Sequence, residues 1–172
     1  MKQFMTKLFM VTVLLTMTTN VNAQKMTYPG VHLGLRVGPT FDSYGVGFLG
    51  GLAADFRLGR IPFYVETGAY FGAVAGGEED HFKTDRQPCP MVPLLFSYHI
   101  YLNRNISIQP FTGATGSFNL REAEINSATY RIGVGFNFKR LYLNVGYDIE
   151  LTMNHYPNFF FTTLGFNIAG RR

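Results

Sequence analysis

The chain has little charge, one cysteine and no tryptophan, and these shortages exclude several kinds of protein. Charged residues make up 15% of the 172 residues, against about 25% in an ordinary soluble domain, so a surface that faces water on all sides is not expected. Cys89 has no cysteine with which to form an intramolecular disulfide, and we expect it to be a small apolar residue at the start of a strand. After residue 23 no run of 18 apolar residues occurs, which predicts no membrane-spanning helix.

The first 23 residues have the pattern of a secretory signal peptide. Two lysines precede a mostly apolar run at residues 8–17, and the small-residue sequence Val-Asn-Ala at 21–23 fits a cleavage site. A cysteine does not follow that site, so lipoprotein processing is not expected. We therefore expect residues 1–23 to be removed and residues 24–172 to form one domain. That domain carries 13 basic and 11 acidic side chains, a net charge of +2, which is too small to indicate a nucleic-acid partner.

Glycine and aromatic residues are abundant instead. There are 19 glycines, 17 phenylalanines and 10 tyrosines. Over residues 130–151 apolar side chains alternate with polar side chains and glycine, and the alternation breaks only at Lys139-Arg140. Because successive side chains of a strand point to opposite faces, this stretch predicts two strands joined by a two-residue turn, with one apolar face.

The same alternation predicts eight strands along the chain. They cover residues 31–41, 45–58, 61–73, 91–102, 106–120, 130–138, 141–151 and 159–169. The fifth is the least regular, because Pro110 interrupts it. The connections after the second, fourth and sixth strands have two or three residues, whereas the later odd-numbered strands are followed by longer loops at 74–90, 121–126 and 152–158. Short turns at one end and long loops at the other are typical of outer-membrane barrels, although the short first connection does not fit as well.

Strand length and glycine content favour the same architecture. Eleven residues rise about 36 Å, or about 28 Å at a tilt near 40°, which covers an apolar band of about 25 Å. Glycine on the polar face suits the narrow interior of an eight-stranded barrel, and aromatic residues near strand ends on the apolar face match interfacial girdles. We therefore predict an all-β fold, an eight-stranded antiparallel up-and-down transmembrane β-barrel whose apolar face meets lipid. The alternative is a soluble, lipocalin-like barrel with the same strands turned inside out.

Five short motifs support a family resemblance through their order and spacing. They are GLRVG at 34–38, YVETG at 64–68, VPLL at 92–95, GVGF at 133–136 and Gly146-Tyr147. With these motifs the chain resembles the outer-membrane β-barrel family of the Bacteroidetes, which includes PorT-like proteins. The resemblance covers nearly all of the chain after residue 23. It implies an eight-stranded barrel in the outer membrane of a Gram-negative bacterium but no single function, since members are diverse. The chain departs from a common barrel pattern at its end, where Phe166 is followed by residues 167–172.

The predicted inward face collects three basic and four acidic side chains. They are Arg36, Asp55, Arg57, Glu66, Arg131, Asp148 and Glu150. Because buried charges are tolerated only when they are paired or hydrated, we expect a structural salt-bridge network that closes the lumen. A small pore or gated passage is the alternative.

Two further groups have residue types that occur in functional sites, but we expect neither to be active. Ser97 and His99, with Glu66 on the neighbouring strand, have the residue types of a hydrolytic constellation, but no nucleophile elbow or oxyanion feature accompanies them, so no catalytic residue is predicted. The acidic stretch 78–85 has a spacing that fits no cation-binding loop. No metal and no cofactor are therefore expected, and neither a phosphate-binding loop nor a nucleic-acid motif occurs.

Basic residues fall in the predicted short turns. Arg60, Arg104, Lys139 and Arg140 form a predicted basic rim, which would face the periplasm and contact phosphate head groups or a periplasmic partner, or else be simply solvated. The sequence as a whole favours a non-enzymatic integral outer-membrane protein with a role in envelope structure or surface interaction. A PorT-like secretion or transport accessory is the alternative, and a lipid-modifying enzyme is the weakest one. The expected partners are outer-membrane lipid and a periplasmic or surface protein, and no nucleic acid.

Overall fold

The computed structural model describes residues 30–43, 45–75, 86–103, 105–119, 124–151 and 158–169. The predicted signal peptide and its cleavage site lie outside the described residues. Within these ranges the chain forms nine strands: β1 (Val31–Asp42), β2 (Gly45–Arg57), β3 (Phe63–Ala75), β4 (Arg86–Tyr98), β5 (Ile100–Tyr101), β6 (Ile106–Asn119), β7 (Glu124–Phe138), β8 (Leu141–Glu150) and β9 (Phe159–Ala169). No helix in this part of the chain is long and apolar enough to cross a membrane.

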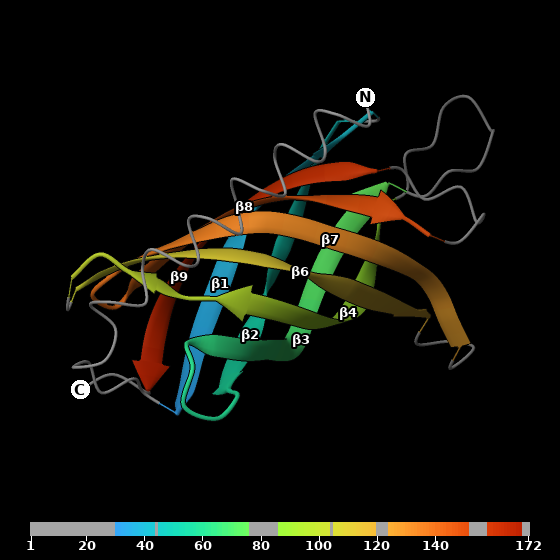
Figure 1. Ribbon diagram of the computed structural model, residues 1–172. Coiled ribbons are helices and arrows are strands. Elements are labelled where there is room, and N and C mark those ends of the chain that lie inside the picture. Colours follow the sequence, from blue (N-terminus) through green and yellow to red (C-terminus); the bar gives the residue numbers. More distant parts are fainter. Residues whose placement is uncertain are drawn as a thin grey trace, which may run out of the picture.

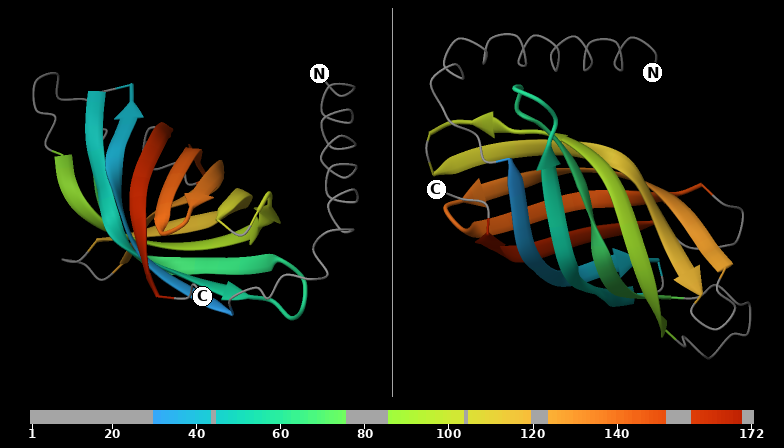
Figure 2. Two further views of the ribbon diagram at one scale, coloured as in Figure 1. Left: turned by 90° about the vertical axis from the view of Figure 1, so that its left-hand side faces the viewer. Right: turned by 90° about the horizontal axis from the view of Figure 1, so that it is seen from below.

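The strands close into a barrel. Neighbours pair antiparallel in the order β4-β3-β2-β1-β9-β8-β7-β6-β5, and the β4–β6 pairing joins the two sides of the sheet. Figures 1 and 2 show the strongly tilted strands wrapping around one interior. The strands β4 and β5 are one predicted strand interrupted at His99, whose backbone N–H donates to Pro62 O at 2.8 Å. The predicted eight-stranded antiparallel up-and-down barrel is therefore confirmed.

The two ends of the barrel differ in their connections. One end, the short-turn end, carries the connections at 58–62, 102–105 and 139–140, and the other, the long-loop end, carries those at 43–44, 76–85, 120–123 and 151–158. In the tightest turn Lys139 has a positive φ of 55°, which a two-residue hairpin with matching twist requires. The connection at 43–44 is short although it belongs to the long-loop end, in line with its poor fit to the sequence pattern.

Two predicted loops are wrong in their bounds. The loop predicted at 74–90 spans only 76–85, because Phe71–Ala75 of β3 pairs with Arg86–Pro90 of β4. The loop predicted at 121–126 spans only 120–123, since β7 begins at Glu124 and pairs with β6 there. Both extensions continue the hairpins at the long-loop end, where backbone pairing proceeds without the apolar alternation that identifies a lipid-facing strand. The strand with Pro110 is confirmed, with Pro110 opposite Val134.

Large apolar side chains point outward on every side of the barrel. Leu52 is 56% exposed, Leu94 53% and Leu164 64%. The polar side chains that alternate with them are buried in the lumen, as the pattern of β8 illustrates. The same strands turned inside out, the soluble alternative, would show the opposite arrangement. The apolar face therefore forms the outside of the barrel.

The middle of the lumen and its long-loop side hold an apolar layer. Its buried members are Leu49, Ala53, Tyr70, Cys89, Met91, Leu95, Phe111, Phe159 and Phe161. The glycines of the lumen wall make room for the rings: a Cβ on Gly133 would lie 2.4 Å from the ring of Phe111, and one on Gly146 would lie 2.5 Å from the ring of Phe161. Because Gly133 and Gly146 are register partners, the two rings pack into one notch in the wall.

Candidate functional site: lumen charges and basic rim

Arg36 is the centre of the larger group of charges in the lumen. Its Nη2 donates to Asp55 Oδ2 at 3.3 Å, and its Nη1 forms an ion pair with Glu66 Oε1. Nη1 also lies 3.3 Å from the hydroxyl of Tyr70, which in turn donates to Glu66 at 3.3 Å. The guanidinium carbon stacks 4.2 Å from the centroid of the Tyr142 ring. One cation from β1 thus holds carboxylates from β2 and β3 together.

Arg131 and Asp148 form a second, separate pair. Arg131 Nε and Nη2 donate to the two oxygens of Asp148, each at 2.7 Å. Thr129 donates to Asp148 Oδ2 at 3.3 Å, and the Arg131 guanidinium lies 4.5 Å from the centroid of the Phe161 ring. Both charges are buried. A two-point contact of this kind is the strongest arrangement available to a guanidinium and a carboxylate.

The two remaining predicted lumen charges lie at opposite ends of the barrel. Arg57 is half-buried at the short-turn end, where its Nε donates to the carbonyl of Ile61 at 3.3 Å. Glu150 is half-buried at the long-loop end, and its backbone N–H donates to Asn158 Oδ1 at 2.8 Å. The structure therefore brings five of the seven predicted charges together as two clusters and places the other two near the mouths.

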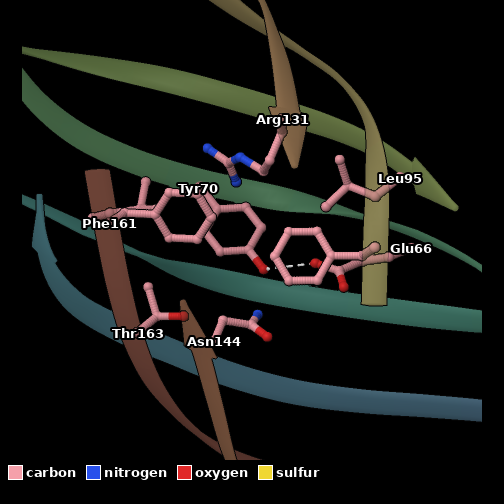
Figure 3. Close-up of a pocket in the computed structure, with 9 residues that line it drawn as sticks. Glu66, Tyr70, Leu95, Arg131, Asn144, Phe161 and Thr163 are labelled. Carbon is pink, nitrogen blue, oxygen red and sulfur yellow. Dashed lines mark hydrogen bonds between the residues drawn. The ribbon is translucent and has the colours of Figure 1, made fainter. Parts of the chain in front are cut away.

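The space between the two charge clusters is almost filled. A small cavity lies among Glu66, Arg131 and the rings of Tyr70 and Phe161. The centre of a water molecule can occupy about 10 Å³ of it. Figure 3 shows Arg131 on one side of Tyr70 and Asn144 on the other. The buried Asn144 Oδ1 has no hydrogen-bond partner among the described residues. A polar cavity of this size suits one water molecule.

A stack of rings fills the lumen at the short-turn end. The ring of His99 lies 3.8 Å from that of Tyr64 at 15°, and His32 stacks on Tyr64 at 5.4 Å. His32 Nδ1 also lies 3.9 Å from Asp55 Oδ2, which joins the stack to the Arg36 cluster. These rings and the apolar layer occupy the lumen together with the charges.

The residues considered for hydrolysis are only partly assembled. Ser97 Oγ lies 3.2 Å from His99 Nε2, but the other ring nitrogen of His99 faces the hydroxyl of Tyr101 at 3.4 Å. Glu66 pairs with Arg36 instead. Ser97 and His99 are 3% and 2% exposed, so a substrate has no access to them in this arrangement.

The predicted basic rim lies at the short-turn end as far as it is described. Arg60, Lys139 and Arg140 are exposed there, whereas Arg104 lies outside the described residues. The acidic stretch 78–85, in which no cation site is expected, also lies outside them. Within the described ranges, no group of three or more His, Cys, Asp or Glu side chains could hold a metal ion.

The sequence pattern does not identify the apolar layer or the contacts that the charges make with aromatic rings. Leu49 is apolar among neighbours that are also apolar, and Phe159–Phe161 has no alternation at all, so the pattern does not say which side chain points inward. Phe111 follows Pro110, where the predicted strand was weakest. Tyr70 follows Glu66 on the same face of β3, and its hydroxyl donates to Glu66, but the strand pattern does not show that the long side chain reaches the carboxylate.

Solved barrels superpose on this chain at low sequence identity. No model of a known protein family and no curated protein matches the chain. A designed transmembrane β-barrel superposes with a TM-score of 0.52 and 14% identity over 83% of this chain and 98% of its own. The crystal structure of Ail, the attachment invasion locus protein of Yersinia pestis, gives a TM-score of 0.46 and 13% identity over 82% and 98% of the two chains. The backbone structure of Ail in a phospholipid bilayer nanodisc gives 0.43 and 13% over 80% and 99%.

At these identities the likeness concerns the fold alone. The designed barrel shares the closed antiparallel sheet, and the outward apolar face of this chain meets the requirement for a lipid-facing surface. Closure also satisfies the backbone groups of the strands without a free sheet edge, as a bilayer demands. The chain is an eight-stranded transmembrane β-barrel.

Proposed function

We propose that this chain is a non-enzymatic integral outer-membrane protein of a Gram-negative bacterium, exported by a cleaved signal peptide, that acts in envelope structure or surface interaction. The observation that carries the proposal is the filled lumen inside an apolar exterior. The Arg36 cluster, the Arg131–Asp148 pair and the rings around them occupy the interior. With the interior occupied and the sides in lipid, the long-loop end is the part that meets partners from outside.

Protease treatment of intact cells tests this role. The connection at 76–85 should be cut while the barrel remains in the membrane, because the long-loop end faces outward in the proposed orientation. A variant with a protease site inserted at Asn103 in the short-turn end is the matched control and should stay protected. Cleavage at the inserted site together with protection of 76–85 would indicate the opposite orientation in the membrane. That result would contradict the proposed role at the surface.

A secretion or transport accessory of the PorT-like kind is the second candidate. Its support is the position of two motifs of the family resemblance. The GLRVG motif supplies Arg36, the YVETG motif supplies Glu66, and the two side chains form an ion pair inside the barrel. The motifs thus meet at the centre of the lumen packing. Loss of a set of secreted proteins on deletion, with an intact envelope, would favour this candidate, whereas envelope defects with normal secretion would favour the first.

A lipid-modifying activity is the weakest candidate. Its residues would be Ser97 and His99, which lie 3.2 Å apart. Their burial and the pairing of Glu66 with Arg36 argue against it. Lipid A composition should be the same in cells that carry the wild type, Ser97→Ala or His99→Ala.

A further inference from the structure

The turn between β7 and β8 carries two adjacent cations above a row of outward-facing apolar side chains. Lys139 Nζ lies 5.8 Å from the centroid of the Phe138 ring, and the Arg140 guanidinium carbon lies 5.9 Å from the centroid of the Phe166 ring. Arg140 O accepts a hydrogen bond from Asn167 N at 2.7 Å, which fixes the turn against β9. Both cations are exposed.

The row beneath the turn runs across three strands. Phe138 pairs with Leu141, and Leu141 pairs with Phe166. Their exposed fractions are 52%, 58% and 44%. A second outward row follows one step further along the strands, with Leu143 opposite Phe136 and Leu164 opposite Leu143. Together the rows form an apolar surface on which acyl chains can lie.

Charge is distributed unevenly between the two ends. Among the described residues, the acidic ones lie either in the lumen or at the long-loop end: Asp55, Glu66 and Asp148 in the lumen, and Asp42, Glu124 and Glu150 at the long-loop end. Within the same residues, no carboxylate therefore lies outside the lumen at the short-turn end. Among the described residues, the cations of the turn therefore have no carboxylate at their own end of the outer surface.

We propose that Lys139 and Arg140 bind the phosphate of an anionic phospholipid whose acyl chains lie over Phe138, Leu141 and Phe166. Cations that extend past the last aromatic ring of an apolar belt reach the level of the head groups. An anionic lipid is preferred to a zwitterionic one because the latter brings its own positive charge. The inference rests on the proposed membrane location and adds a lipid class and a binding position to it.

Native mass spectrometry of the refolded full-length protein tests the site with defined lipids. The wild type should retain phosphatidylglycerol in preference to phosphatidylcholine of the same chain length. Each cation near an anionic head group contributes about fivefold in affinity, so Lys139→Gln or Arg140→Gln should lose about fivefold of the preference and the double variant should lose nearly all of it. Arg86→Gln, which removes a cation at the first residue of β4 at the long-loop end, is the matched control and should keep the preference.

Each other outcome is also informative. Equal retention of both lipids by the wild type, or a preference that survives in the double variant, would overturn the site. A preference lost equally in Arg86→Gln would do the same, because it would reflect net charge and not position. Suppression of lipid binding by inorganic phosphate at equal concentration would show that the site binds a free anion and not a lipid. A gel-mobility shift on boiling, measured for every variant, separates these results from failure to form a membrane barrel, which would contradict the proposed function itself.

Discussion

Arg131 and Asp148 are register partners on β7 and β8, and their side chains meet in two hydrogen bonds of 2.7 Å inside the lumen. The arrangement follows from the hairpin itself. The two-residue turn at Lys139-Arg140 fixes the register of the two strands, and this register places the two charges opposite each other on the inward face. The pair therefore ties the β7–β8 hairpin together across its lumen surface.

Breaking this pair should destabilise the barrel strongly. Asp148→Asn leaves the buried Arg131 charge without its counter-charge, at an expected cost of about 3–5 kcal/mol. The urea midpoint of refolded protein, followed by the mobility shift on boiling, measures it. Replacing both members, Arg131→Met with Asp148→Leu, should cost less than the single change because no unpaired charge remains. Arg60→Gln at the exposed rim is the control, with an expected change within about 0.5 kcal/mol. If Asp148→Asn is as stable as Arg60→Gln, the Arg131–Asp148 pair does not contribute to the stability of the barrel.

A methyl group at Gly133 should disturb the lumen packing. Its Cβ would lie 2.4 Å from both Val145 O and the Phe111 ring, and since the carbonyl belongs to the paired strand it cannot rotate away. We expect Gly133→Ala to cost about 1–3 kcal/mol in the same unfolding assay. Gly116→Ala, whose Cβ would make ordinary contacts of 3.7 Å with the Phe118 ring, should be close to neutral. Equal stability of the two variants would argue against close packing of rings on the lumen wall.

An arginine on the outer face should destabilise the barrel strongly at mid-height and only weakly near its edge. Leu52 is 56% exposed near the centre of β2, and Leu102 is 61% exposed at the short-turn end. In lipid, Leu52→Arg should cost about 2–4 kcal/mol and Leu102→Arg about 0–1 kcal/mol. Both changes should be nearly neutral if the surface faces water. Equilibrium unfolding from phospholipid vesicles distinguishes these cases, and equal small effects at the two positions would contradict a lipid-facing surface.

The lumen should not conduct ions. The ring stack of His32, Tyr64 and His99, the two charge clusters and the apolar layer together fill the lumen. Recordings in planar bilayers should therefore show no steady channels at the nanosiemens scale, under conditions in which a general porin conducts. Steady openings of that size in the wild type would show that the side chains move apart, and would favour the predicted alternative of a small pore.

The sequence predicted the architecture well because a lipid-facing strand must alternate. From Tyr130 to Leu151 the apolar side chains identify the outward face, and the short turn defines the hairpin register. The prediction was wrong at the long-loop end, where β7 begins at Glu124. Small polar residues such as Ser127 and Thr129 continue the pairing there, and they carry no apolar signal.

The contents of the lumen were less accessible to sequence reasoning. The Arg36 cluster joins three strands, so its contacts depend on two successive registers and on side-chain reach. The alternation showed which charged side chains face the lumen but not which of them form ion pairs. The rings of Phe111 and Phe161 point inward although the sequence predicts a polar lumen, because their register partners on the adjacent strands, Gly133 and Gly146, leave space that large side chains fill. The pairing of a large residue with a glycine on the neighbouring strand is not visible in the periodicity of a single strand.

The central claim is that this chain is a folded barrel in the outer membrane, and one measurement tests it most directly. Cells that express the full chain are fractionated, and the membrane fraction is run on a gel with and without boiling. The protein should be found in the outer-membrane fraction, should resist extraction with carbonate, and should change its mobility on boiling as folded barrels do. Recovery from the soluble periplasmic fraction, with the same mobility before and after boiling, would contradict the account.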